Sequence, residues 1–262
     1  MDWIEVNGAC LRYDLGGRGT ETLLLVHELG GALESWDETL PRLQAHFRAL
    51  RYDQRGFGLS EKARGTLALE TMVGDIVALL DALGIGAPCH VIGSALGAGI
   101  AIALAAWHPQ RVARLVACNP ATGVSGDRAA MLEERAAAVE AGGMRAYAER
   151  SLNNSYPEVL RGDRERFERY RKRWIGNDPF GFAAINRMLM HMDLAADYGR
   201  IRCPTLVLSG AHDKLRPTPV VKAIADAIPG ARFREIDSGH FMAVQTPELF
   251  LQTVLPFLRG EG

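Results

Sequence analysis

The sequence lacks any long uninterrupted run of apolar residues. A membrane-spanning helix needs about 18 to 20 of them, and the longest apolar stretch, residues 98–107, is much shorter. We interpret that stretch as a buried helix. The first ten residues, MDWIEVNGAC, contain two acidic side chains, no basic one and no apolar core, so they do not resemble an export signal. The sequence therefore predicts a cytoplasmic protein without a membrane span.

Cysteine and net charge are also scarce. The four cysteines have no paired metal-ligand spacing, and we expect them to be reduced, as is usual in the cytoplasm; they are Cys10, Cys89, Cys118 and Cys203. The formal net charge is −1 at pH 7, which does not favour nucleic acid or an anionic membrane. We therefore expect a small-molecule partner, no metal, no nucleic acid and no membrane. The oligomeric state is left open, with a homodimer among the alternatives.

What the chain does contain is a regular alternation of short apolar runs and helical stretches. Asn7-Gly8 is a strong signal for a hairpin between the first two runs. Buried strands are typically short apolar runs, whereas helices place apolar residues three and four apart. The predicted strands cover residues 3–6, 9–15, 22–27, 47–53, 89–92, 112–119, 205–210 and 231–236, and the predicted helices between them cover 36–45, 70–83, 96–107, 218–228 and 247–258. This order predicts a mostly parallel central sheet with helices on both faces.

Strand signals are missing from about residue 122 to residue 202. Turn signals at residues 141–143, 156–157 and 177–179 divide this segment into several helices. We predict an α/β core formed by residues 1–121 and 203–262, interrupted by a helical cap over residues 122–202. The cap is expected to lie over the carboxyl ends of the strands, where open α/β sheets bind ligands.

The sharpest motif is Gly93-Ser94-Ala95-Leu96-Gly97, at the junction of a predicted strand and a predicted helix. It has the frame of a nucleophile elbow, G-x-S-x-G, in which the central residue occupies a strained turn and small neighbours let strand and helix approach. In this frame the position of the nucleophile belongs to Ala95. Ser94 comes one residue too early, so its side chain should point away from the nucleophile's position. We keep Ser94 only as a candidate for substrate binding.

Two further loops follow strands in the chain order nucleophile, acid, base. Asp213 comes after the strand at 205–210, and His240 comes after the strand at 231–236. In a catalytic triad the carboxylate fixes the imidazole tautomer and the imidazole takes the proton of the nucleophile. We predict Asp213 as the acid and His240 as the base, with His212 as a weaker alternative for the base.

The loop His27-Glu28-Leu29-Gly30-Gly31 directly follows the strand at 22–27. A loop in this place supplies one donor of the oxyanion hole. We predict the backbone N–H groups of Leu29 and Leu96 as the two donors. Glu28 stands where a glycine is usual, and we expect either an exposed loop carboxylate or a carboxylate at the pocket rim that contacts substrate.

With these segments in hand, the sequence resembles the α/β-hydrolase superfamily, and within it the branch of 3-oxoadipate enol-lactonases, small bacterial esterases and ring-fission hydrolases. The resemblance covers about residues 3–121 and 203–259 and rests on five matches in chain order: 27–31, 53–60, 93–97, Asp213 with Pro217, and Gly239-His240. It implies acyl transfer to water through a covalent serine ester, without a metal or an organic cofactor. The expected substrate is a small ester, lactone or amide, such as a carboxylate-bearing catabolic intermediate.

Ala95 departs from this pattern because alanine has no nucleophilic atom. Loss of one triad member typically removes several orders of magnitude in rate. We favour an engineered Ser→Ala change that keeps the other catalytic residues in place. The alternatives are a natural pseudo-hydrolase that binds a small molecule, or a protein that uses His240 to activate water directly. A carbon–carbon bond hydrolase of ring-fission products and a cofactor-free oxygenase are related alternatives.

The cap supplies further candidates for substrate binding. Arg187, if it faces the pocket, would pair with a substrate carboxylate through two hydrogen bonds, and Trp174 would form an aromatic wall. The alternative is that these side chains pack within the cap or face solvent. The candidates are Asn153, Asn154, Tyr156, Trp174, Arg187, Met190 and His191.

Overall fold

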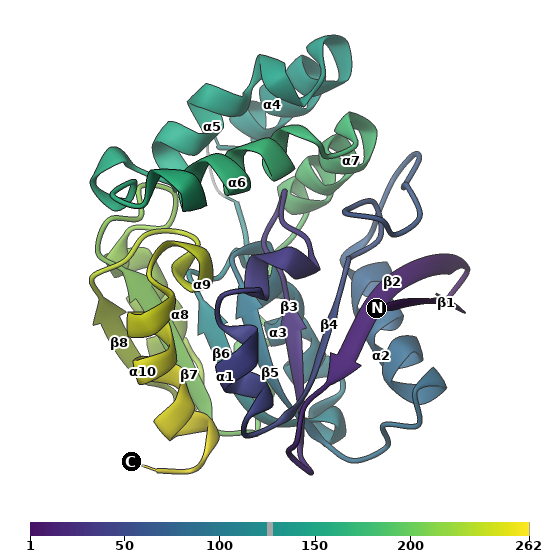
Figure 1. Ribbon diagram of the computed structural model, residues 1–262, viewed down its shortest axis with the longest axis vertical. Coiled ribbons are helices and arrows are strands. Elements are labelled where there is room, and N and C mark those ends of the chain that lie inside the picture. Colours follow the sequence, from purple (N-terminus) through teal and green to yellow (C-terminus); the bar gives the residue numbers. More distant parts are fainter. Residues whose placement is uncertain (125–127, 262) are drawn as a thin grey trace.

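The computed structural model describes residues 1–124 and 128–261. Its centre is an eight-stranded sheet with the order β1-β2-β4-β3-β5-β6-β7-β8, shown in Figure 1. The strands are β1 (Asp2–Val6), β2 (Ala9–Gly16), β3 (Thr22–Val26), β4 (Arg48–Tyr52), β5 (Cys89–Ser94), β6 (Val112–Cys118), β7 (Thr205–Gly210) and β8 (Arg232–Ile236). The pairs β1–β2 and β2–β4 are antiparallel and the other five pairs are parallel, which confirms the predicted mostly parallel sheet.

Helices cover both faces of the sheet. Apolar side chains of α2, α3 and α8 pack in one core cluster with the sheet, and those of α1, α9 and α10 pack in a second cluster. The helices of the core are α1 (Leu40–Gln44), α2 (Leu69–Ala82), α3 (Leu96–Trp107), α8 (Thr218–Ala227), α9 (Met242–Gln245) and α10 (Pro247–Leu258), with short 3-10 helices η1 (Leu33–Trp36), η2 (Pro109–Arg111) and η5 (Tyr198–Arg200). This arrangement explains why β5 is buried along its whole length and β3 is apolar and buried after Thr22.

One predicted helix is wrong in its extent. The segment 36–45 does not form one helix, because η1 ends at Trp36 and α1 begins only at Leu40. Pro41 lies in the first turn of α1. A proline has no N–H to donate and its ring collides with the carbonyl four residues earlier, so a helix can start at Pro41 but cannot run through it.

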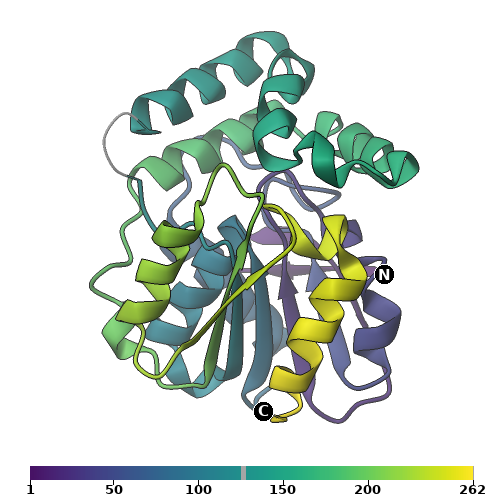
Figure 2. The same ribbon diagram turned by 90° about the vertical axis from the view of Figure 1, so that its left-hand side faces the viewer.

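Four longer helices form a layer over the carboxyl ends of the parallel strands, as Figures 1 and 2 show. They are α4 (Arg128–Gly142), α5 (Ala148–Ser155), α6 (Arg164–Ile175) and α7 (Pro179–Met190), with η3 (Met144–Ala146) and η4 (Glu158–Leu160) between them. The helix α7 begins where the sequence pattern indicates, because the carboxylate of Asp178 accepts a hydrogen bond from the N–H of Gly181 and Pro179 occupies the first turn. We call α4 to α7 the cap. In the described part of the chain, no helix combines the length and apolar character of a membrane span.

Candidate active site

Ala95 occupies a strained turn between the end of β5 and the first residue of α3. Its backbone dihedrals are φ 51° and ψ −107°, a combination that side-chain-bearing residues rarely adopt. A Cβ atom on Gly93 would collide with the carbonyl oxygen of Gly97, and a Cβ atom on Gly97 would collide with that of Val26. Glycine at both positions therefore lets strand and helix meet closely. The protein has the backbone of a nucleophile elbow with a methyl group at its tip.

His240 and Asp213 are joined by a hydrogen bond in the loops that follow β8 and β7. The distance between Nδ1 of His240 and Oδ2 of Asp213 is 2.6 Å, and both residues are buried. The other carboxylate oxygen, Oδ1, accepts hydrogen bonds from the backbone N–H groups of Leu215 at 2.7 Å and Arg216 at 3.0 Å. Because Nδ1 faces the carboxylate, Nε2 of the imidazole is the nitrogen left to exchange a proton with a substrate or a water.

Asn119 fixes the loop that carries His240, and the sequence reasoning did not identify it. Its Nδ2 donates to the carbonyl oxygens of Gly239 at 2.8 Å and His240 at 3.2 Å, and its Oδ1 accepts from the N–H of Gly210 at 2.9 Å. Asn119 is fully buried, directly after β6, with φ 46°. Asparagine tolerates this left-handed conformation better than most residues. An asparagine directly after a predicted strand was therefore the feature of the sequence that could have identified this residue.

The two predicted oxyanion donors belong to residues that line one cavity together with Ala95 and His240. Leu96 is the first residue of α3, and the first N–H groups of a helix have no acceptor within the helix. Leu29 lies in the loop after β3, which His27 holds in place. The imidazole of His27 accepts from the N–H of Gln54 at Nε2, 3.0 Å away, and its Nδ1 lies 2.8 Å from the carbonyl oxygen of Glu28. A ring with one accepting nitrogen is neutral, in agreement with burial, which lowers the pKa of His27.

Glu28 lies neither in solvent nor on the cavity wall. Its side chain is buried beneath the loop, where Oε1 accepts a hydrogen bond from Oγ of Ser35 at 2.8 Å. Burial and then the charge of Glu28 raise the pKa of Tyr170, in the cap helix α6, well above its usual value. The carboxylate therefore lies between the loop after β3 and the cap. Both sequence predictions for Glu28, an exposed loop carboxylate and a carboxylate at the pocket rim, are wrong.

The cap candidates are distributed differently from the sequence expectations. Trp174 and Asn154 line the cavity, whereas Tyr156 is buried in the cap among aromatic rings. Arg187 forms salt bridges with Glu133 at 2.9 Å and Glu140 at 2.7 Å. These two carboxylates lie on one face of α4 and raise the pKa of Arg187. The other candidates outside the cavity lining are Ser94, Asn153, Met190 and His191.

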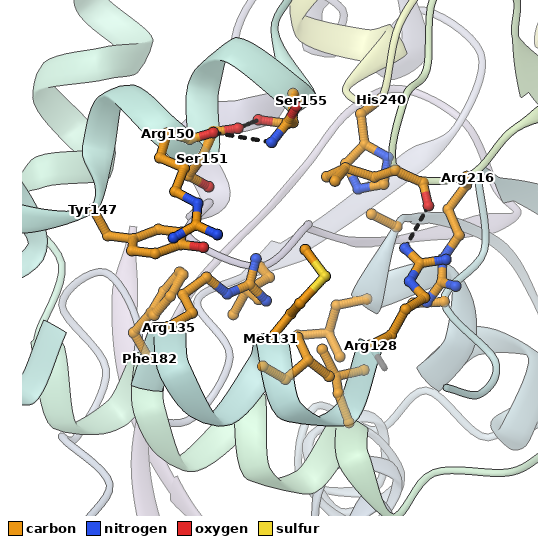
Figure 3. A pocket seen from close by; sticks show the side chains of 18 of the residues that line it. Arg128, Met131, Arg135, Tyr147, Arg150, Ser151, Ser155, Phe182, Arg216 and His240 are labelled. Carbon is orange, nitrogen blue, oxygen red and sulfur yellow. Dashed lines mark hydrogen bonds between the residues drawn. The ribbon is translucent and has the colours of Figure 1, made fainter. Parts of the chain in front are cut away.

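The cavity has a volume of about 130 Å³ and is mostly apolar. Since a single water needs at least about 10 to 15 Å³ of such space, the cavity is large enough for a small organic ligand. Its lining includes four arginines, shown in Figure 3: Arg128, Arg135, Arg150 and Arg216. The sequence reasoning did not identify these four residues. Across residues 1–124 and 128–261, no three His, Cys, Asp or Glu side chains are placed to share a metal ion.

An elbow directly after the central strand, opposite a histidine on the last loop of the sheet, is the arrangement that defines the α/β-hydrolase class. The protein is an α/β-hydrolase in its fold. Comparison of its sequence with known families then gives the narrower assignment: the chain belongs to the serine aminopeptidase S33 family, whose sequence model matches residues 18–238.

Individual relatives agree with this assignment. The chain is 32% identical to a protein of Caulobacter sp. strain K31 named as a carbamate hydrolase, RutD, over 92% of each chain. It is 30% identical to the crystal structure of an enol-lactonase from Burkholderia xenovorans LB400, with a TM-score of 0.93 over 98% of this chain and 100% of that one. A hydrolase from Pseudomonas aeruginosa PA01 is 35% identical, with a TM-score of 0.92 over 98% and 97%. These likenesses confirm the resemblance drawn from the sequence motifs.

Proposed function

We propose that this protein is a cofactor-independent hydrolase of a small acyl compound, in which His240 activates water directly. The observation that carries the proposal is the 2.6 Å hydrogen bond between His240 and Asp213 beside a residue without a nucleophilic atom, Ala95. The base and its orienting carboxylate are in place, whereas a covalent serine ester cannot form. Carbamates and lactones, the compounds named for two relatives, join esters and amides as candidate substrates.

The proposed reaction consumes one water. Nε2 of His240 takes a proton from the water while its oxygen attacks the carbonyl carbon of the substrate. The carbonyl oxygen gains negative charge, which the N–H groups of Leu29 and Leu96 stabilise. The carbon–oxygen or carbon–nitrogen bond then breaks, and the imidazolium returns its proton to the leaving group. Asp213 stabilises the imidazolium in between. Because water is a weaker nucleophile than an activated serine, strained or activated acyl groups suit this route best.

A second candidate is a serine-type hydrolase in which an alanine has replaced the serine at position 95. The elbow conformation favours this second candidate. Holding a residue at φ 51° costs about 1 to 3 kcal/mol of stability, and alanine has no side-chain group that could use the strained position for catalysis. In this case the chain binds its substrate without turning it over, as the expected engineered Ser→Ala change would.

The two candidates are separated by comparing the chain with Ala95→Ser and His240→Ala on activated esters, lactones and carbamates. Direct water attack predicts turnover by the unchanged chain, no burst of acyl-enzyme, and a loss of about 10² to 10⁴-fold in His240→Ala. The second candidate predicts no turnover until serine is restored, then a gain of about 10³-fold or more with a burst. If both the chain and Ala95→Ser are inert, the protein binds a ligand without hydrolysing it.

The same proposal includes a cytoplasmic setting. All four cysteines are free thiols in the structure, and burial raises the pKa of Cys89 to about 11, so that this thiol stays protonated and unreactive. Free, buried thiols are typical of proteins in a reducing compartment.

A further inference from the structure

The backbone N–H of Leu29 is available to a ligand in the cavity. Leu29 lines the cavity beside Ala95, and within residues 1–124 and 128–261 no group accepts a hydrogen bond from its N–H. A peptide group is planar, with its C=O and N–H pointing in opposite directions. The direction of this N–H is therefore set by the carbonyl group of Glu28, which belongs to the same peptide group.

Two donors hold the carbonyl oxygen of Glu28. One is the backbone N–H of Gly31 at 3.0 Å, which closes a four-residue turn, and the other is Nδ1 of His27 at 2.8 Å. Gly30, the third residue of this turn, has φ 80°, the conformation for which type II turns use glycine. Glycine also adopts many other conformations readily, so contacts from outside the turn matter for keeping Gly30 and Gly31 in one geometry.

One such contact comes from Asn177, which lies between the cap helices α6 and α7 (Figure 1). Its Nδ2 donates to the carbonyl oxygen of Gly30 at 2.8 Å. The same nitrogen lies 3.0 Å from the carbonyl oxygen of Trp174 and 3.3 Å from that of Arg173, both in the last turn of α6. All three partners are acceptors, so only the NH₂ end of the amide suits this place. The side chain is thus anchored on the cap while it holds a loop of the core.

A second contact from the cap is the indole of Trp174. A Cβ atom added to Gly30 would lie 2.6 Å from Nε1 of Trp174, so the ring packs directly against the backbone of the turn. Trp174 is itself buried and packs against Phe182 of α7, with ring centroids 5.3 Å apart. The cap therefore restrains the turn through both a hydrogen bond and a buried ring.

We infer that Asn177 of the cap is a positioning residue for the oxyanion donor at Leu29. The peptide group between Gly30 and Gly31 accepts from Asn177 through its carbonyl oxygen. Through its N–H it donates to the carbonyl oxygen of Glu28, whose peptide group carries the N–H of Leu29. Two planar groups in series thus connect the cap to the donor, and hydrogen bonds in such a chain polarise one another. The role of Leu29 as a donor rests on the proposed function.

The expected effect of Asn177 falls on kcat rather than on KM. Negative charge develops on the carbonyl oxygen of the substrate only in the transition state, so a misdirected donor weakens the transition state more than the bound substrate. Removal of an oxyanion donor costs about 10² to 10³-fold in kcat. Asn177→Ala leaves the donor present but less well directed, and we expect a loss of about tenfold with KM within about twofold.

The first measurement is the hydrolysis of p-nitrophenyl acetate by the unchanged chain and by Ala95→Ser, each with and without a change at Asn177. Asn177→Asp keeps the shape of the side chain but has no N–H to donate, so it should lose at least as much kcat as Asn177→Ala. Asn177→Gln keeps the amide and should retain more kcat than Asn177→Asp. Arg171→Gln is the control, because it removes the 2.6 Å salt bridge of α6 to Glu149 outside the cavity lining; its kcat and KM should stay within about twofold.

The second measurement is amide hydrogen exchange, followed by NMR without substrate. Asn177→Ala should speed the exchange of the N–H of Gly31 by about tenfold, because its hydrogen bond to Glu28 is weakened. Amides in the middle of α6 should exchange as in the unchanged chain. A merely structural role of Asn177 would instead speed exchange throughout α6 and leave kcat unchanged in the folded protein.

Unchanged exchange at Gly31 overturns the inference, and so does faster exchange with an unchanged kcat. Circular dichroism identifies a variant that fails to fold; if Asn177→Ala does, the comparison of Asn177→Asp with Asn177→Gln carries the test. Failure of the proposed function is a separate result. If neither the chain nor Ala95→Ser hydrolyses the ester, the proposed function is refuted, and the exchange rate of Gly31 alone then decides whether Asn177 holds the turn.

Discussion

Arg216 donates its backbone N–H to Oδ1 of Asp213 at 3.0 Å, while its guanidinium lines the cavity beside Ala95. One short loop after β7 thus carries both the carboxylate that is hydrogen-bonded to His240 and a positive charge on the cavity wall. The position of the acid and the position of this guanidinium therefore depend on the same loop.

The role of Asp213 is tested by Asp213→Asn. The amide of asparagine has no negative charge to stabilise the imidazolium, and its NH₂ group can donate to Nδ1 and so favour the wrong tautomer of His240. Hydrolysis by the chain, or by Ala95→Ser, should therefore fall by about 10² to 10⁴-fold. A second His–Asp pair provides the control: Nε2 of His212 lies 2.7 Å from Oδ1 of Asp237, in an exposed position. Asp237→Asn should leave the rate within about twofold, and an equal loss in both variants would contradict the assignment of Asp213.

Asn119 should contribute to stability through its three buried hydrogen bonds. Asn119→Gly removes the side chain but suits the backbone at φ 46°, and we expect a loss of about 2 to 4 kcal/mol in the free energy of unfolding in urea. Asn119→Ala should lose about 1 kcal/mol more, because alanine is strained in this conformation. Equal stability of the two variants would show that the backbone conformation at this position carries no strain.

Buried His27 should make the protein less stable in acid. Burial lowers its pKa, so below about pH 6.5 the unfolded chain binds a proton that the folded chain does not. The free energy of unfolding then decreases as the pH falls from about 6.5, with a slope of up to about 1.4 kcal/mol per pH unit from this group. In His27→Gln the decrease between pH 7 and pH 5 should be shallower, measured by urea unfolding at each pH. Burial also lowers the pKa of His90, so His90 makes both the unchanged chain and His27→Gln less stable in acid.

Arg187 illustrates where the sequence stops determining the site. The order of Ala95, Asp213 and His240 after their strands was enough to predict their meeting, because the carboxyl ends of parallel strands share one edge of the sheet. No such rule fixes the direction of a side chain on a cap helix. That direction depends on how α4 packs against α7, which brings Glu133 and Glu140 to Arg187 and leaves Arg135 for the cavity.

The pairing of Arg187 with α4 is directly measurable. Arg187→Gln should lower the free energy of unfolding in urea by less than about 1 kcal/mol, because its salt bridges are partly exposed and screened by solvent. A loss of several kcal/mol would contradict the partly exposed position of these salt bridges.

The glycines of the elbow give the sharpest test of its backbone. Gly97→Ala places a Cβ atom against the carbonyl oxygens of Val26 and His27, which belong to the sheet and to the loop after it and cannot move independently. We expect a loss of about 3 kcal/mol or more in the free energy of unfolding. Gly86→Ala is the control, since a Cβ atom there meets nothing within 4 Å, and its stability should change by less than about 0.5 kcal/mol. The loss in Gly97→Ala should appear equally in the chain with Ala95 and in Ala95→Ser, because the close approach of helix and strand is a property of the backbone. A tolerated Gly97→Ala would mean that α3 lies farther from β3 than the structure places it, and the N–H of Leu96 would then no longer face the oxyanion position.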